Sequence, residues 1–289
     1  MSYVIETRNL SHYYMEGTPN KIAALKDVNI KIKPGEAVGI IGHTGSGKST
    51  LISHFNALLK PSSGSVLIDG EDIFTSKETV RNSRFKVGLC FQYPEYQLFE
   101  ETVFKDIAFG PKNMKLGEEE IKERVLKAAA YTGVSSDWLD KSPFDLSGGE
   151  KRRVAIAGVV AMEPEVLVLD EPAAGLDPAG RRSLIEMINN YREKTGSTVV
   201  IVSHSMEDIA RMADRLIVMN KGEVAMDGTL NEVFSQSDRL AEIGLDVPEI
   251  TKIFAEIKKR GIDVPLDVYS LDRAEEVIRS MLRERGAAQ

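Results

Sequence analysis

Nine residues at positions 42–50, GHTGSGKST, constrain the fold of this chain more than any other stretch. They follow an apolar run at 37–41 and precede a helix-compatible stretch at 51–59, which predicts a strand, a glycine-rich loop and a helix. The glycines let the backbone curl until successive N–H groups point inward, and the helix adds its positive dipole end. The stretch predicts a binding site for the phosphates of a nucleotide. A glycine-rich turn without chemical function is the alternative.

The residue types in this loop predict individual contacts. The Lys48 ammonium would reach the β- and γ-phosphates, and the Ser49 hydroxyl would ligate Mg²⁺. We expect the nucleotide-binding residues of the loop to be Gly42, Thr44, Gly45, Ser46, Gly47, Lys48, Ser49 and Thr50.

Composition limits the class of protein. A chain of 289 residues can hold one large domain, or a main domain with an appendage. Its 42% hydrophobic and 28% charged content is typical of a soluble globular protein with a substantial core. A net charge of −7 argues against nucleic acid as the main partner, although it leaves room for a locally basic groove.

No segment of the sequence indicates secretion or a membrane span. Residues 1–6 lack the basic and apolar regions of a signal peptide, and apolar stretches such as 155–162 are too short to cross a bilayer. The single cysteine, Cys90, lies in an apolar run and is expected to be a buried structural thiol. Any location at a membrane would therefore come from a partner.

Apolar strands alternate with helices through the middle of the chain, which predicts an α/β fold with a mainly parallel sheet covered on both faces. The expected strands of this sheet are 37–41, 87–91, 166–170 and 198–202, and the expected helices are 118–131, 147–162 and 178–194. A smaller β layer would contain strands at 3–9, 28–32 and 66–68, with turns at 15–20, 33–36 and 61–65.

The character of the sequence changes after Gly228. Residues 229–289 contain no buried-strand run and offer two helical stretches, 248–260 and 271–285. Apolar residues recur at helical spacing on the first of these, at Ile250, Ile253, Phe254 and Ile257. This face could pack on its own domain or against another chain. We therefore divide the chain into a main domain at 1–230 and a helical appendage at 231–289.

Polar residues follow three of the predicted strands. Asp170 ends the strand at 166–170, where ligand-facing residues of parallel sheets are found, and could hold Mg²⁺ through a bound water. Glu171 could orient or deprotonate the attacking water. Gln92 could approach the metal and sense the γ-phosphate, and His204 could contact the γ-phosphate or the water. For each of these residues, a solvated or structural position is the alternative.

A second anion site is predicted at 146–150, LSGGE, where a turn opens a helix. One chain with one phosphate loop has no obvious need of a second such site. We therefore expect Ser147, Gly148 and Gly149 to bind the nucleotide of another subunit, so that two chains facing head to tail enclose two nucleotides.

Together these residues resemble the ATP-binding cassette (ABC) ATPases. Residues 42–50 match Walker A, 166–170 Walker B, 146–150 the signature motif and 174–177 the D-loop. Gln92 and His204 match the Q-loop and the switch histidine. Tyr14 falls where the family stacks an aromatic ring on adenine, and Tyr13 is the competing choice. The resemblance covers residues 3 to about 230 and implies ATP as the nucleotide, hydrolysis with Mg²⁺ and a helical subdomain at about 93–162.

The segment after Gln92 narrows the resemblance. Residues 93–99, YPEYQLF, and 102–111 are similar to the ATPases of energy-coupling factor transporters, and most like the second of their two types. The C-terminal helices resemble the dimerisation appendage of that group. The resemblance implies import of vitamins or other micronutrients by a complex at the cytoplasmic face of the cell membrane. Its other members would be a first-type ATPase, a transmembrane coupling protein docking near 92–111, and substrate-capture membrane proteins.

Other assignments are kept as alternatives. The aromatic residues of 93–99 could instead be packed in the core. The chain could serve a conventional importer that depends on a binding protein, or form a homodimer. A soluble ABC ATPase of repair or chromosome structure would carry long coiled coils between residues 50 and 146, where no heptads occur. A non-catalytic scaffold is disfavoured by the presence of Glu171 and His204. The sequence does not identify a transported substrate.

Overall fold

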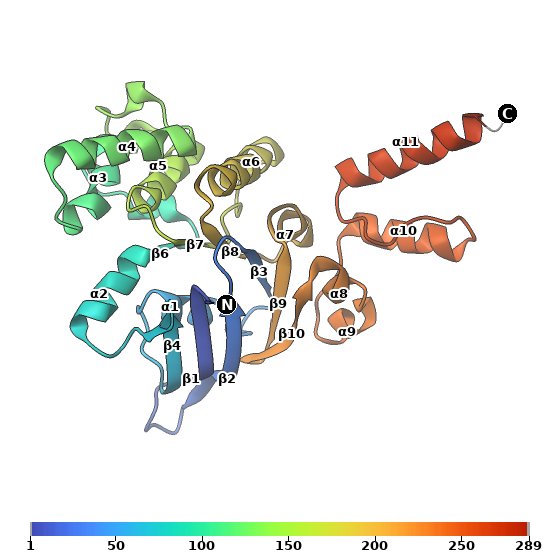
Figure 1. Cartoon of the computed structure of the whole chain (residues 1–289), viewed down its shortest axis with the longest axis horizontal. Coiled ribbons are helices and arrows are strands. Elements are labelled where there is room, and N and C mark those ends of the chain that lie inside the picture. Colours follow the sequence, from blue (N-terminus) through green and yellow to red (C-terminus); the bar gives the residue numbers. More distant parts are fainter. Residues whose placement is uncertain (1, 288–289) are drawn as a thin grey trace.

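A six-stranded sheet forms the centre of the molecule (Figure 1). The structure is a computed structural model that describes residues 2–287, with side chains for residues 2–283. The sheet is parallel except at one edge, where β10 runs antiparallel to β9. Its strands, in spatial order, are β10 (Glu223–Thr229), β9 (Arg215–Asn220), β3 (Ala37–Ile41), β8 (Thr198–Val202), β7 (Val166–Asp170) and β6 (Val87–Cys90). The prediction of a mainly parallel sheet is confirmed.

Both faces of this sheet are buried against other elements. Side chains alternate along each strand, so that neighbouring residues pack into different cores. In β7, Val166 and Val168 join a core shared with the antiparallel sheet and α1. Leu167 and Leu169 join a core on the opposite face, shared with α5, α6 and α7. Continuous apolar runs in the sequence are the consequence.

A separate antiparallel sheet forms the smaller β layer, below the central sheet in Figure 1. Its spatial order is β2 (Ile22–Ile32), β1 (Ile5–Tyr14), β4 (Ser63–Ile68) and β5 (Glu71–Asp72). Strands β1 and β2 are longer than the predicted 3–9 and 28–32. Irregular pairing between Thr7 and Tyr13 breaks the strict alternation on which the shorter prediction depended.

The helices form two groups around the central sheet. Helices α3 (Val103–Asn113), α4 (Glu118–Thr132) and α5 (Gly148–Val160) form a cluster at one side, with short 3-10 helices η1 (Pro94–Gln97), η2 (Ser136–Trp138) and η3 (Pro143–Asp145). The remaining helices of the main body are α1 (Lys48–Phe55), α2 (Lys77–Lys86), α6 (Pro178–Thr195) and α7 (Met206–Met212). Sequence signals fix α6 at both ends: Asp177 caps its first turn, Pro178 begins it, and Gly196 ends it with a φ of 69°.

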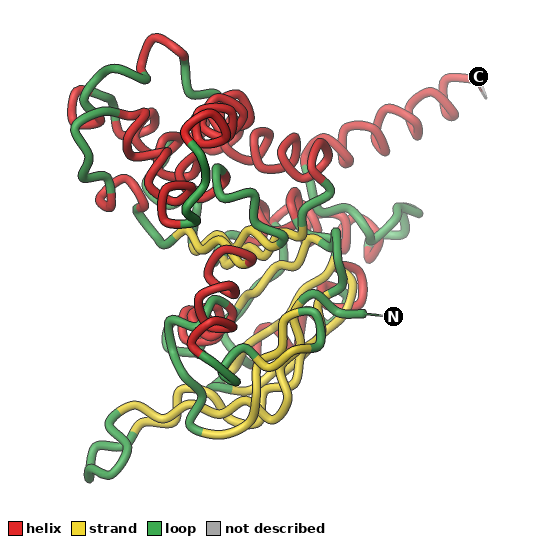
Figure 2. The backbone as a smooth tube through the Cα atoms, turned by 60° about the vertical axis from the view of Figure 1, so that its left-hand side comes forward, coloured by secondary structure: helices red, strands yellow, loops and turns green. Residues whose placement is uncertain are grey.

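The C-terminal residues are helical, as predicted. They form α8 (Leu230–Phe234), α9 (Ser237–Glu242), α10 (Glu249–Lys259) and α11 (Leu271–Ala287), and α11 extends away from the body (Figure 2). Phe254 packs with Val264, Val268 and Ala274 in a small core of its own. Val233 and Val247 belong to the main core instead. The division into domains at 1–230 and 231–289 stays a prediction. Residues 1 and 288–289, at the outer ends of these two domains, lie outside the described residues.

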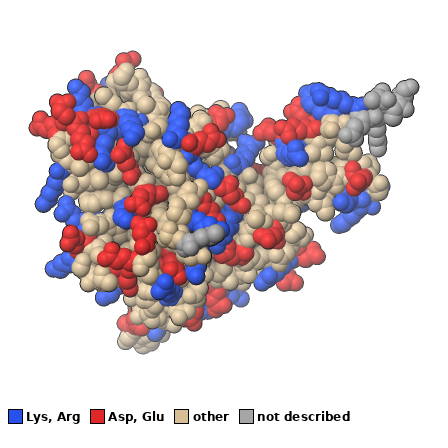
Figure 3. Space-filling model, in the orientation of Figure 1, with Lys and Arg blue, Asp and Glu red and all other residues tan. Residues whose placement is uncertain are grey.

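Charged side chains of both signs are present on the surface, and the single cysteine is buried as predicted. Acidic and basic side chains are mixed over the face shown in Figure 3, without a continuous basic area. Cys90 is buried, and burial raises the pKa of its thiol to about 12, so the thiol stays protonated at neutral pH. Within residues 2–287, none of the helices is both long enough and apolar enough to cross a bilayer.

Candidate functional site

A cavity of about 880 Å³ opens at the carboxyl ends of β3, β7 and β8. This edge of a parallel sheet is where α/β proteins bind ligands. The cavity collects residues that lie far apart in the sequence. It is lined by residues 42–50, Gln92, Asp170, Glu171, His204, Met206 and residues 244–246.

The glycine-rich loop connects β3 to α1 as predicted, although α1 begins at Lys48 and ends at Phe55. The Lys48 ammonium donates hydrogen bonds to the carbonyl oxygens of Gly42 (2.6 Å) and His43 (3.1 Å). Gly47 has a φ of 103°, and a Cβ atom there would lie 2.6 Å from the Ala24 carbonyl oxygen. The loop therefore needs glycine at this position, and a curled glycine-rich loop of this kind presents backbone N–H groups to an anion.

The end of β7 lies against the start of α1. The Ser49 hydroxyl donates a hydrogen bond of 3.1 Å to the Asp170 carboxylate. Burial raises the pKa of Asp170, and the hydrogen bond from Ser49 opposes this shift. A hydroxyl, a carboxylate and the nearby Gln92 amide are oxygen donors of the kind that Mg²⁺ prefers. These residues therefore fit a Mg²⁺ ion, which would take its other ligands from water and phosphate.

Glu171 and His204 form a pair beside this position. The Nδ1 atom of His204 lies 2.8 Å from the Glu171 carboxylate. Glu171 is mostly enclosed, whereas the His204 side chain is 75% exposed toward the cavity and solvent. Glu171 has a positive φ of 49°, and its N–H donates to the carbonyl oxygen of Val202 at the end of β8. This bond holds the two strand ends in register and aims both side chains at the cavity.

The two candidate adenine platforms differ in their surroundings. The Tyr14 hydroxyl lies 3.2 Å from the Thr50 hydroxyl, and the Tyr14 ring meets His12 edge to face. The Tyr13 ring is covered by the Lys21 ammonium, 3.8 Å from the ring centroid. Tyr14 is therefore the ring adjoining the phosphate loop. This contact favours Tyr14 as the adenine platform, which stays a prediction.

The structure does not bring the second predicted anion site into this cavity. Ser147, Gly148 and Gly149 are exposed at the start of α5 and are absent from the cavity lining. Ser147 and Glu150 cap the helix reciprocally, with the Ser147 N–H donating to the Glu150 carboxylate at 2.8 Å. The turn is therefore separate from this chain's own phosphate loop, and its contact with the nucleotide of another chain stays a prediction.

The aromatic residues after Gln92 are on the surface. The side chains of Tyr93, Tyr96 and Phe99 are 39%, 84% and 58% exposed. Phe99 meets Phe109 of α3 edge to face, with ring centroids 5.0 Å apart. The alternative that these rings pack in the core is therefore wrong, and an apolar surface lies next to the nucleotide cavity.

Sequence reasoning missed one part of the cavity wall. Gly244, Leu245 and Asp246, between α9 and α10, border the cavity near Met206. No motif marks this segment, and it begins forty residues beyond the last predicted site residue, His204. Its position is set by Val247, which packs into the main core.

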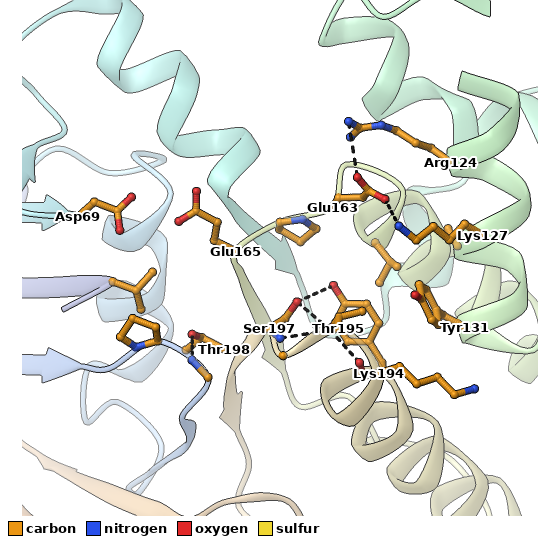
Figure 4. A pocket seen from close by; sticks show the side chains of 18 residues that line it. Asp69, Arg124, Lys127, Tyr131, Glu163, Glu165, Lys194, Thr195, Ser197 and Thr198 are labelled. Carbon is orange, nitrogen blue, oxygen red and sulfur yellow. Dashed lines mark hydrogen bonds and ion pairs between the residues drawn. The ribbon is translucent and has the colours of Figure 1, made fainter. Parts of the chain in front are cut away.

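A second cavity, of about 550 Å³, lies at the opposite, amino ends of the parallel strands (Figure 4). There Glu163 pairs with Lys127 at 2.6 Å and with Arg124 at 3.6 Å, which joins α4 to the turn before β7. None of the predicted site residues lines this cavity. It also lacks a glycine-rich loop, and the amino ends of parallel strands are not where such sheets bind nucleotides.

Comparison with known proteins gives a consistent result. Residues 25–174 match the family described as ABC transporter. The chain is 55% identical to the energy-coupling factor transporter ATP-binding protein EcfA2 of Caldanaerobacter subterraneus, covering 96% of this chain and 98% of that protein. It is 50% identical to the protein of the same name from Clostridium perfringens, with 96% and 98% covered.

Two solved structures share the fold. One is cbiO1 from Clostridium perfringens, described as part of the ABC transporter complex cbiONQ, with a TM-score of 0.75 and 40% identity, covering 88% of this chain and all of that one. The other is the ATP-binding cassette MJ0796 in a dimeric, post-hydrolysis state bound to ADP and Pi. Its TM-score is 0.69 and its identity 30%, with 78% and 98% of the two chains covered.

Proposed function

Because this chain belongs to the ABC transporter family, within the group of energy-coupling factor transporter ATP-binding proteins, we propose that it powers an importer of that group. The chain is an ATP-hydrolysing subunit, and ATP is its nucleotide. The observation that carries the proposal is the Glu171–His204 pair, next to the Ser49–Asp170 hydrogen bond in one cavity. A base, a metal-binding pair and a phosphate loop are thus assembled at one place.

We infer that the loop binds the triphosphate and that Tyr14 stacks on adenine. Lys48, now bonded to two loop carbonyls, would turn to the β- and γ-phosphates. Ser49, Asp170 and Gln92 would hold Mg²⁺, which supplies charge neutralisation of the phosphate oxygens when bound. Burial lowers the pKa of Lys48, while the carboxylates of Glu171 and Asp170 oppose this shift. An incoming phosphate would likewise favour the charged form of the amine.

Glu171 is proposed as the residue that polarises the attacking water. Its enclosed carboxylate is oriented by His204, whose ring is free to turn toward the γ-phosphate. Gln92, exposed at the cavity edge, would complete the positioning of the water. A positioned carboxylate of this kind typically accelerates a reaction about 10²–10⁴-fold.

The exposed Ser147–Gly149 turn supports a head-to-tail dimer. In the proposed arrangement this turn closes over the γ-phosphate of a related ATPase of the first type, or of a second copy, while that subunit's turn closes the cavity described above. Hydrolysis would then reopen the dimer. We further propose that residues 1–230 form the ATPase domain and 231–289 a dimerisation appendage.

The exposed aromatic surface formed by Tyr93, Tyr96, Phe99 and Phe109 suits a docking site for a transmembrane coupling protein. It adjoins Gln92, so a change at the γ-phosphate can reach it directly. Docking there would hold this chain at the cytoplasmic face of the cell membrane, with substrate-capture proteins for vitamins or other micronutrients completing the complex.

The proposal can be tested by purifying the tagged chain from detergent-solubilised membranes of its native host. Recovery of a related ATPase, one integral coupling protein and several small membrane proteins would support it and would identify candidate substrates. Recovery of a permease pair with a binding protein would indicate a conventional importer. If ATP hydrolysis is retained but no membrane protein is recovered, the transport part of the proposal fails.

A further inference from the structure

Arg152, on α5, is a buried arginine that contacts two other segments of the chain. Only 3% of its surface is exposed. Its Nε and Nη2 atoms donate to the two oxygens of Glu95, at 3.0 and 2.6 Å. Its Nη1 atom donates to the carbonyl oxygens of Pro172 and Ala174, at 3.1 and 2.7 Å. Four hydrogen bonds therefore fix the guanidinium in one orientation.

These two segments and α5 itself each adjoin part of the proposed machinery. Glu95 lies in η1, three residues after Gln92. Pro172 directly follows Glu171, and Ala174 lies two residues further on. Arg152 itself lies in the second turn of α5, the helix that begins at the Ser147 turn. One side chain thus joins the γ-phosphate sensor, the loop of the proposed base and the helix that faces the other subunit.

The chemistry of the contact requires arginine. The planar guanidinium presents a fork that matches a carboxylate on one edge and still has N–H groups for two carbonyls. A lysine ammonium could not span both. Because the pair is buried, loss of either partner leaves the other charge without compensation.

The turn that contains Glu95 begins at a strained residue and is joined to α5 by this buried ion pair. Tyr93 has a positive φ of 56°, a conformation that costs energy for a residue with a side chain. The Arg152 guanidinium also lies over the Tyr93 ring, 5.8 Å from its centroid. Among the side chains of residues 94–97, Glu95 is the one that ties the turn to α5 through hydrogen bonds. A turn that is joined to a helix by a buried, bidentate ion pair is expected to move with that helix.

We propose that Arg152 is a positioning residue that makes η1, the 172–174 loop and α5 move as one unit when the γ-phosphate arrives or leaves. This inference rests on the proposed function, because it assigns the route by which the nucleotide site and the aromatic surface at 93–99 communicate. Arg152 does not touch the nucleotide cavity.

The test is hydrogen–deuterium exchange on the purified chain, with and without a non-hydrolysable ATP analogue and Mg²⁺. In the unsubstituted protein, the amide hydrogens of 93–99 and of 172–177 should both exchange more slowly when the analogue is bound. In Glu95→Gln, the response at 93–99 should fall at least threefold, while that at 172–177 persists through the remaining Arg152 bonds. Glu101→Gln is the matched control, because Glu101 pairs only with Lys105 on the surface.

Two results would overturn the inference: an undiminished response at 93–99 in Glu95→Gln, or the same loss in Glu101→Gln. If Glu95→Gln fails to fold, the double variant Glu95→Gln/Arg152→Gln replaces it. The inference then stands only if binding of the analogue no longer slows exchange at 93–99 in that variant. In the purified transporter, Glu95→Gln should lower the substrate moved per ATP at least threefold. The transporter could move no substrate while 93–99 and 172–177 still become protected together. That result would count against the proposed function and not against this inference.

Discussion

The Nδ1 atom of His204 lies 2.8 Å from the carboxylate of Glu171, although the two residues come from different strand ends. Strands β7 and β8 are hydrogen-bonded neighbours, and the bond from the Glu171 N–H to the Val202 carbonyl keeps their ends level. The pair therefore depends on the register of the sheet. Any nucleotide-driven shift of the loop after β8 would change the orientation of the Glu171 carboxylate.

Replacing Glu171 with glutamine should lower ATP turnover by about 10²–10³-fold, because the amide cannot accept a proton from water. ATP binding should be retained, since the loop and Lys48 are unchanged. Turnover should be measured in a complex whose other site is disabled. Near-normal turnover there would show that Glu171 does not have the proposed role.

Replacing Gly47 with alanine should destabilise the loop by about 1–3 kcal/mol and abolish ATP binding, because the Cβ atom would lie 2.6 Å from the Ala24 carbonyl oxygen. Gly45→Ala is the control: Gly45 also has a positive φ, but a Cβ atom there meets nothing within 4 Å. Its expected cost is about 1 kcal/mol from backbone strain alone. Urea unfolding and nucleotide titration should separate the two variants, and equal effects would contradict the steric argument.

Ser147→Ala should reduce hydrolysis at the other subunit's nucleotide while leaving ATP binding at this chain's own loop unchanged. The variant also loses a helix cap worth about 1 kcal/mol. Ser142→Ala controls for that loss, because Ser142 caps η3 nearby. Trapping of labelled nucleotide, quantified separately for each subunit of the purified complex, measures which of the two sites is impaired. A defect confined to this chain's own site would argue against the head-to-tail arrangement.

Folding stability should fall in mild acid because of His54. This residue is fully buried, and burial lowers the pKa of its imidazole from 6.5 to about 4. Between those values the unfolded chain binds the proton and the folded chain does not, so stability is full above pH 6.5 and decreases as the pH falls toward 4. The expected loss from this group is about 3 kcal/mol at pH 4.

The measurement is urea unfolding at several pH values for the natural chain and for His54→Asn. The asparagine amide can still donate to the Thr50 carbonyl, which His54 Nδ1 contacts at 2.7 Å, but it does not titrate. The natural chain should lose more stability than the variant between pH 6.5 and 4. Identical pH profiles would show that His54 is not the cause.

The phosphate loop, the succession of strands and helices along the chain, and the polar residues that follow the strands could all be predicted from the sequence. These features are local: a glycine-rich turn between an apolar strand and a helix has few other solutions, and parallel strands bring their carboxyl ends to one edge. Asp170 could be predicted because it ends an apolar strand of a parallel sheet. Tyr14 was expected only from the resemblance to the ABC ATPases, and it stays a prediction. The C-terminal helices were identifiable from their periodicity.

The contacts between distant segments could not be predicted in this way. Strand β9 pairs in parallel with β3, but no strand was expected at 215–220. Residues 244–246 border the nucleotide cavity because Val247 is packed in the main core. Arg152 is hydrogen-bonded to Glu95, which lies 57 residues earlier in the sequence. Such contacts depend on packing across the whole molecule, whereas secondary structure and loop conformation depend on neighbouring residues, and only the latter leave a pattern in the sequence.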